Sequence, residues 1–184
     1  LDPQDQQWKF DSSSHFIFSK NGVFQSATSQ EGDLIVSPDG DPYIRSACVG
    51  FSLIFNVFDP RTFKPEKNLT GRYGSGPACQ PSRQWNFEFS YMTPATRKLA
   101  MDYMDSIPNG AFVVVRSINN FTQTAGFIND WIADESLNGA GKTLYHKLKS
   151  VGFNDIDQFT SPKSFIHIYQ KGNSGFVPAS AISQ

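Results

Sequence analysis

The first 49 residues contain short apolar segments bounded by turn signals, a pattern that is typical of short β-strands. Residues 15–19 (HFIFS) and 23–25 (VFQ) flank Asn21-Gly22. This dipeptide predicts a two-residue hairpin turn, because both turn positions need a positive φ. A further short strand is expected over 33–37, which a Pro-Asp-Gly turn follows.

The middle of the chain contains two strand patterns of different kinds. Residues 50–58 (GFSLIFNVF) form a nearly continuous apolar run, which is typical of a strand buried on both faces. Residues 83–91 place aromatic side chains at every second position, so we expect a half-buried strand there. Residues 60–82 are rich in proline and glycine and are expected to form a long loop.

Helical patterns begin after residue 92. Thr93 provides a capping oxygen and Pro94 suits a first turn, so a helix is expected over 94–107. A second helix is expected over 140–151, with Gly152 as its C-terminal stop.

These elements predict one α/β (mixed) domain: a central mixed β-sheet with helices packed on it, plus an N-terminal β-hairpin segment. The expected sheet strands are 51–58, 84–91, 111–118 and 164–170, and the expected helices are 94–107 and 140–151. The expected organisation is a single domain over 1–172, with a β segment at 1–49, a core at 50–172, an irregular loop at 119–137, and a linker or tail at 173–184.

Composition and charge narrow the classes of function. The 16 basic and 17 acidic residues form no basic stripe, so we expect no nucleic-acid partner. No apolar run reaches the roughly 18 residues needed to cross a bilayer, so no membrane insertion is expected. The chain begins at Leu1 rather than Met and shows no signal peptide, so we interpret it as a mature or excised piece.

The two cysteines, Cys48 and Cys79, bear on the compartment. Two free buried thiols are one interpretation. We favour a Cys48–Cys79 disulfide formed in an oxidising environment, because the N-terminus looks excised. The expected location is therefore extracellular or at the cell surface. Two cysteines and three scattered histidines without a C-x-x-C motif form no metal-ligand set, so no metal and no other cofactor is expected.

Motifs for catalysis are weak. Residues 139–143 (GAGKT) are similar to the end of a phosphate-binding loop, but Ser136 stands where that motif has its first glycine. His15, His146 or His167 could serve as a base for Ser75 or Cys79 of the 60–82 loop, yet no nucleophile signature is present. His167 is expected to be packed within a strand and His146 to be solvated. We therefore expect a non-catalytic domain.

One polar segment contains the candidate binding residues. Trp131 follows Asn129 and Asp130, and Phe121 and Phe127 lie just before them. An exposed aromatic ring beside amide and carboxylate groups is common in sites for proteins and for sugars. The alternative is that Trp131 anchors the segment by packing on the domain.

From residue 50 to residue 172 the chain resembles the interleukin-like EMT-inducer domain family, also called the GG domain. Residues 51–62 resemble the family's buried strand that ends in a DPKTG turn. Residues 99–110 (LAMDYMDSIPNG) resemble its FLNSIPDG helix exit, and 147–152 (KLKSVG) resemble LKSLGS. Residues 164–172 (SFIHIYQKG) resemble its last strand.

The resemblance implies extracellular recognition rather than catalysis. The N-terminal segment and the 60–82 insertion are most similar to the Bacteroidota versions, which include sortase-like surface proteins of type IX secretion. The implied function is an interaction domain of a larger bacterial cell-surface protein that binds a protein partner. A carbohydrate-binding module and a secreted cytokine-like protein are the alternatives, and a hydrolase is a further one. The family's sugar-binding Arg-Asp pair is replaced here by Pro162-Lys163, which favours a protein partner over a glycan.

Overall fold

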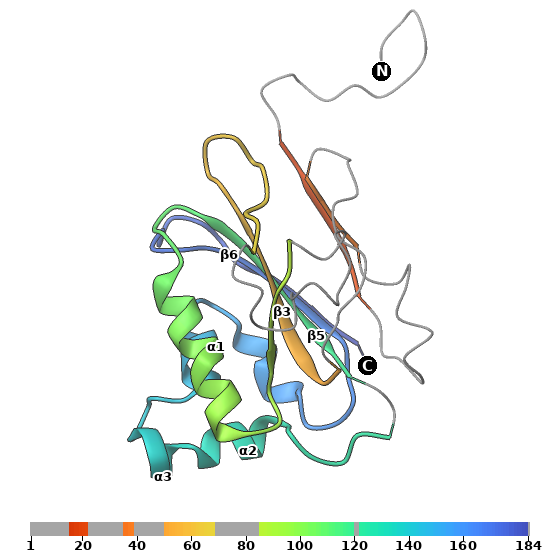
Figure 1. The fold of residues 1–184 in the computed structure, drawn as a ribbon, viewed down its shortest axis with the longest axis vertical. Coiled ribbons are helices and arrows are strands. Elements are labelled where there is room, and N and C mark those ends of the chain that lie inside the picture. Colours follow the sequence, from red (N-terminus) through yellow and green to blue (C-terminus); the bar gives the residue numbers. More distant parts are fainter. Residues whose placement is uncertain (1–14, 22–34, 39–49, 69–84, 120–121, 184) are drawn as a thin grey trace, which may run out of the picture.

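The computed structural model describes residues 15–21, 35–38, 50–68, 85–119 and 122–183 (Figure 1). A five-stranded sheet has the strand order β4-β3-β5-β6-β7, and β1 and β2 form a separate two-stranded sheet. The strands are β1 (Ile17–Lys20), β2 (Ile35–Pro38), β3 (Ser52–Phe58), β4 (Phe87–Ser90), β5 (Phe112–Ile118), β6 (Phe165–Gln170) and β7 (Ala179–Ile182). The helices are α1 (Pro94–Ser106), α2 (Ile128–Ala133), α3 (Glu135–Asn138), α4 (Leu144–Ser150) and the short 3-10 helix η4 (Asn154–Gln158).

The helices lie on one face of the five-stranded sheet and the β1–β2 hairpin lies on the other (Figure 1). The α/β class expected from the sequence is therefore confirmed. The strand pairings are antiparallel rather than mixed. β4 and β5 both run antiparallel to β3, so they are parallel to each other, and α1 crosses over between them. A β-α-β order suggests parallel neighbouring strands, hence the expected mixed sheet. Here β3 lies between the parallel strands β4 and β5, so no two neighbouring strands are parallel.

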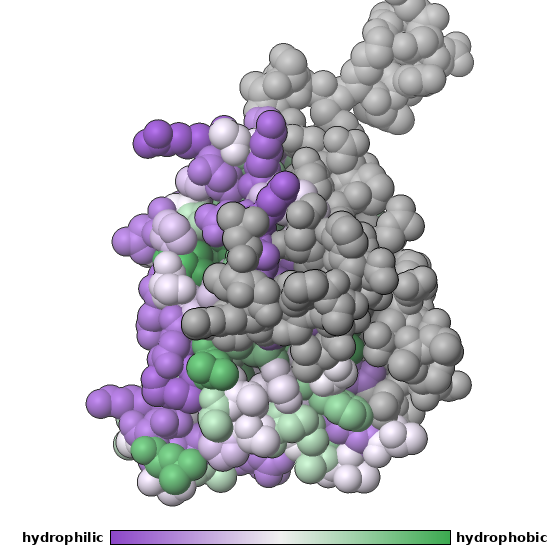
Figure 2. Space-filling model, viewed as in Figure 1, coloured by the Kyte–Doolittle hydropathy of each residue, from purple (hydrophilic) through white to green (hydrophobic). Residues whose placement is uncertain are grey.

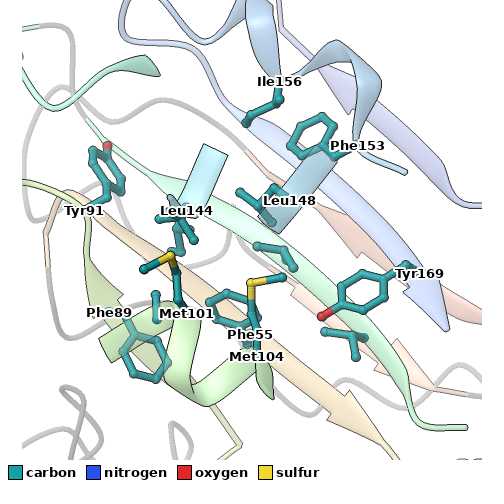
Figure 3. Packing of buried hydrophobic residues seen from close by; sticks show 14 of the residues in the cluster. Phe55, Phe89, Tyr91, Met101, Met104, Leu144, Leu148, Phe153, Ile156 and Tyr169 are labelled. Carbon is teal, nitrogen blue, oxygen red and sulfur yellow. The ribbon is translucent and has the colours of Figure 1, made fainter. Parts of the chain in front are cut away.

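Aromatic rings and two methionines fill the space between the sheet and the helices. Figure 3 shows Met101 and Met104 of α1, and Leu144 and Leu148 of α4, gathered around Phe55 of β3. All five side chains are at most 7% exposed. This layer holds α1 and α4 against the sheet and fixes the space between the two helices.

The start of α1 follows the capping expected from the sequence. The Thr93 hydroxyl accepts a hydrogen bond from the Thr96 backbone N–H at 3.2 Å, and the Thr96 hydroxyl accepts one from the Thr93 N–H at 3.3 Å. Pro94 occupies the first helical position. This reciprocal pair satisfies two amides that would otherwise lack partners.

The N-terminal hairpin differs from the expected one. β1 pairs with β2, with Ile17 opposite Pro38 and Lys20 opposite Ile35, rather than with residues 23–25, which lie outside the described residues. Asn21 serves as a tether, because its Nδ2 donates to the carbonyl oxygens of Ser117 at 2.9 Å and Phe165 at 2.8 Å. Those two bonds join the hairpin to β5 and β6.

Two segments expected to be irregular contain regular structure. The linker predicted at 173–184 is wrong in part, because β7 pairs with β6 along Ala179–Ile182. The loop predicted over 119–137 contains α2 and α3. β7 has small side chains that give little hydrophobic signal, and α2 and α3 are too short to show a helical period.

Candidate functional site

A groove between α1 and α4 is the candidate site. It has a volume of about 430 Å³ and extends over the loop that leads into α4. Its lining residues, which we call the charged groove, are Lys98, Met101, Asp102, Asp105, Asn138, Gly141, Lys142, Thr143, His146, Lys147 and Ser150. Figure 2 shows mostly hydrophilic residues along the left side of the view, over α1, with a hydrophobic spot over α3 at the lower left.

The charged groove has an apolar floor and a rim of ion pairs. Met101 is 7% exposed and belongs to the core beneath the groove. Lys98 pairs with Asp102 along α1. Lys147 of α4 pairs with Asp105 of α1, and this hydrogen bond lowers the pKa of the Asp105 carboxyl below its ordinary value. The second ion pair ties the two walls of the groove together.

Lys142 is the lysine of the charged groove whose charge is not balanced internally. It is exposed, and no hydrogen bond or ion pair of its ammonium group occurs within the described part of the chain. The side-chain amide of the neighbouring Asn138 likewise makes no hydrogen bond to a described residue. Lys98 and Lys147 are paired with the two aspartates, so Lys142 is the lysine of the groove lining that has no ion-pair partner among the described residues.

The GAGKT loop binds a carboxylate of the chain itself. The Gly141 backbone N–H donates to Glu135 Oε1 at 2.7 Å, and His146 Nε2 lies 3.5 Å from the same oxygen. This amide is where a phosphate-binding loop would hold its ligand. The loop also follows α3 rather than a buried strand, so the arrangement does not support nucleotide binding.

A hydroxyl, an imidazole and a carboxylate nevertheless lie next to one another. His146 Nδ1 is 3.0 Å from the Thr143 hydroxyl, and its Nε2 faces Glu135. These three residues were not grouped as a site from the sequence, because Glu135 lies 11 positions before His146 and no sequence motif links them. Thr143 is 1% exposed, so its hydroxyl lies beneath the surface of the groove.

Of the two alternatives for Trp131, an exposed binding ring and an anchor packed on the domain, the structure shows the anchor. Its side chain is 0% exposed, and its Nε1–H donates to the Gly126 carbonyl at 2.9 Å. The ring packs against Tyr91 at 5.7 Å and Phe159 at 5.5 Å. The segment is rich in polar residues because α2 turns its other side to solvent, whereas Trp131 points into the core as an anchor.

The other candidate binding residues are dispersed. Asn129 is exposed, and Asp130 is exposed while its carboxylate accepts a hydrogen bond from the Gly126 N–H at 2.7 Å. Phe127 is half-buried and packs edge-on against Phe159 at 5.6 Å. Phe121 lies outside the described residues. Asp130 and Trp131 thus both bind the backbone of Gly126 and stabilise the local fold. The described candidate residues do not gather into an exposed aromatic surface.

Of the remaining candidates, His167 is described by the structure and the two cysteines are not. His167 is packed within β6 as expected, where burial lowers its pKa to about 4. Its ring stacks on Phe153 at 4.7 Å, and its Nε2 lies 3.1 Å from the Val151 carbonyl. Cys48 and Cys79 lie outside the described residues, so the proposed disulfide stays a prediction.

A buried ion pair supports the helices beside the groove. The Arg97 guanidinium binds both carboxylate oxygens of Asp134, at 2.6 and 2.7 Å, and donates to the Tyr91 carbonyl at 2.7 Å. Both side chains are at most 4% exposed. The pair therefore locks α1 to the junction of α2 and α3, where an isolated charge would be unstable.

Comparisons with known proteins assign no function. No family model matches the chain, and no functionally described protein matches it in sequence. The family suggested by the sequence thus stays a prediction. Among the described residues, no helix is long and apolar enough to cross a membrane, and no cluster of His, Cys, Asp or Glu side chains is arranged to hold a metal ion.

Proposed function

We propose that this chain is a non-catalytic recognition domain of a larger extracellular or cell-surface protein, and that it binds a protein partner through the charged groove. The observation that carries the proposal is the groove itself, a cavity of about 430 Å³ with a Met101 floor and a charged rim. A concave site with apolar contact area and a few polar groups is what binding sites commonly provide.

The lining of the charged groove favours a protein over a glycan. Sugar rings bind well to flat, exposed aromatic faces, but no Trp, Tyr or Phe is among the described residues that line the groove. Trp131, the ring that would have formed such a face, is buried. A flexible thioether floor such as Met101 adapts instead to the varied side chains of a protein.

The family resemblance supports the same conclusion from a different direction. The segments between residues 50 and 172 resemble a domain family whose activity is recognition, with its most similar members in bacterial surface proteins of type IX secretion. The sugar-binding pair of that family is replaced by Pro162-Lys163. Membership would place the domain at the cell surface within a larger protein.

A hydrolase is the second candidate, because Thr143, His146 and Glu135 form a contiguous hydroxyl, imidazole and carboxylate. A nucleophile must contact its substrate, whereas the Thr143 side chain is almost fully buried. Treatment with a fluorophosphonate probe separates the two functions. We expect no labelling, and labelling that disappears in Thr143→Val would support the hydrolase.

The recognition proposal is tested by photo-cross-linking from inside the groove. A photoreactive amino acid replaces Ser150, on the exposed rim, and in a control protein it replaces Thr62, which is exposed and does not line the groove. Both proteins are incubated with cell-surface extracts and, in parallel, on a glycan array. We expect a protein adduct from position 150 only, competed by the unmodified domain.

Two results would contradict the proposal. Equal adducts from positions 150 and 62 would show that the groove is not the contact surface. Binding of defined glycans, blocked by a bulky substitution at Ser150 and unaccompanied by any protein adduct, would replace the protein partner with a carbohydrate.

A further inference from the structure

The chemistry of the partner follows from the charges of the charged groove. Three lysines and two aspartates line it. Lys98 and Lys147 are neutralised by Asp102 and Asp105. The Lys142 ammonium group forms no ion pair with a described residue, so it can bind a negatively charged group of a partner.

The polar groups near Lys142 are suited to accept a negative group. Asn138 and Lys142 both line the groove, and neither side chain is engaged by a described residue. An ammonium group and a side-chain amide can both donate to carboxylate oxygens. The nearby carboxylate of Glu135 does not line the groove, and its Oε1 accepts a hydrogen bond from the Gly141 amide at 2.7 Å.

We propose that the partner inserts a peptide segment with an acidic side chain, whose carboxylate binds Lys142 and Asn138 while an adjacent apolar side chain packs on Met101. This inference rests on the proposed function and specifies the partner's chemistry. The volume of about 430 Å³ is enough for a few side chains rather than a folded domain. A short acidic-apolar segment therefore fits both the size and the charge of the site.

Selection from a library of random dodecapeptides displayed on phage tests the inference on the full chain. We expect the selected peptides to be enriched in Asp or Glu next to an apolar residue. Methyl NMR then locates them, since the chain has three methionines. The Met101 methyl signal is expected to shift on peptide binding, while the core Met104 and the more distant Met92 serve as internal references.

A double-mutant cycle isolates the proposed contact. The selected peptide is compared with its Asp→Asn or Glu→Gln version, on the unmodified domain and on Lys142→Gln. We expect either single change to weaken binding about fivefold, which corresponds to the upper range for exposed ion pairs, and the two together to weaken it little further. Lys64→Glu, an exposed lysine outside the groove, is the charge control and should leave the affinity unchanged.

The outcomes separate this inference from the proposed function. Peptides that shift Met101 but bind equally well without their acid would overturn the acidic partner and leave groove recognition intact. Selected peptides that leave Met101 unshifted, or a selection that yields no groove-binding peptide, would overturn both. Binding that is weakened equally by Lys142→Gln and by Lys64→Glu would show a non-specific charge effect and would also overturn the inference.

Discussion

The two faces of the five-stranded sheet are buried in different ways. The helix face is filled by rings and aliphatic side chains, with Phe55, Leu53 and Val115 all at 0% exposure. Within the described residues, the hairpin face has a smaller apolar cluster built on Phe58 and Val114. The charged groove lies on the helix side, next to the larger of the two described clusters.

Each side of the sheet has one buried arginine, and the two arginines differ in how completely their guanidinium groups are hydrogen-bonded. Arg97, on the helix side, is fully engaged by Asp134 and the Tyr91 carbonyl. Arg116, on the hairpin side, is 0% exposed and donates to Asn56 Oδ1 at 2.9 Å, but its Nε and Nη1 have no hydrogen-bond partner within the described ranges. Desolvation lowers the pKa of Arg116 to about 9, and the charge of Glu88 opposes this shift. Arg97 therefore stabilises the fold, whereas burial of Arg116 opposes it.

The largest expected effect is on the helix side, at Trp131. We expect Trp131→Ala to lower the free energy of unfolding by about 4 kcal/mol, because a buried ring and its hydrogen bond to Gly126 are lost. Urea unfolding followed by circular dichroism measures this. Leu137→Ala, at a side chain 69% exposed, should change stability by less than about 0.5 kcal/mol. Similar small effects in both variants would contradict the core position of Trp131.

The two arginines provide the next test. Arg97→Met leaves Asp134 buried without its partner and should cost about 3 kcal/mol, whereas Arg116→Met removes an incompletely hydrogen-bonded guanidinium but also leaves the buried Glu88 without its opposite charge, so it should be destabilising by less. The same unfolding assay compares them. Equal destabilisation by the two changes would mean that the hairpin face supplies Arg116 with partners as good as those of Arg97.

Acid should weaken the helix side through His167. The folded-state pKa is about 4, below the ordinary 6.5, because burial disfavours the charged ring. The unfolded chain thus binds more protons between these values, so this contribution is present above pH 6.5 and is lost as the pH falls toward 4. The expected loss is about 2–3 kcal/mol. Unfolding curves from pH 7 to pH 4 measure it, and His167→Phe should remove most of this dependence.

The elements that the sequence predicted well are those whose signals are local. The strands β3, β5 and β6 begin and end within two residues of the expected positions, since each is a run of buried apolar or β-branched residues. The start of α1 was specified by Thr93 and Pro94. Each of these signals lies within the element itself, so the element can be recognised without knowing which residues pack against it.

The candidate site could not be predicted in the same way. Its lysines are ordinary surface residues in the sequence, and the ion pair between Lys147 and Asp105 joins positions 42 residues apart. The sequence left open whether Trp131 is exposed or packed as an anchor, because the polar residues around it describe the outer side of α2 alone. Only tertiary packing decides which side of so short a helix is buried.

We have proposed that the partner binds the charged groove on the helix side. Hydrogen–deuterium exchange of the full chain, with and without the partner captured from position 150, locates the surface that the partner covers. We predict that binding slows exchange in α1, in α4 and in the loop that holds Lys142, and leaves β1 unchanged. Slower exchange in β1 with none in α1 or α4 would place the binding surface on the hairpin face and contradict the account.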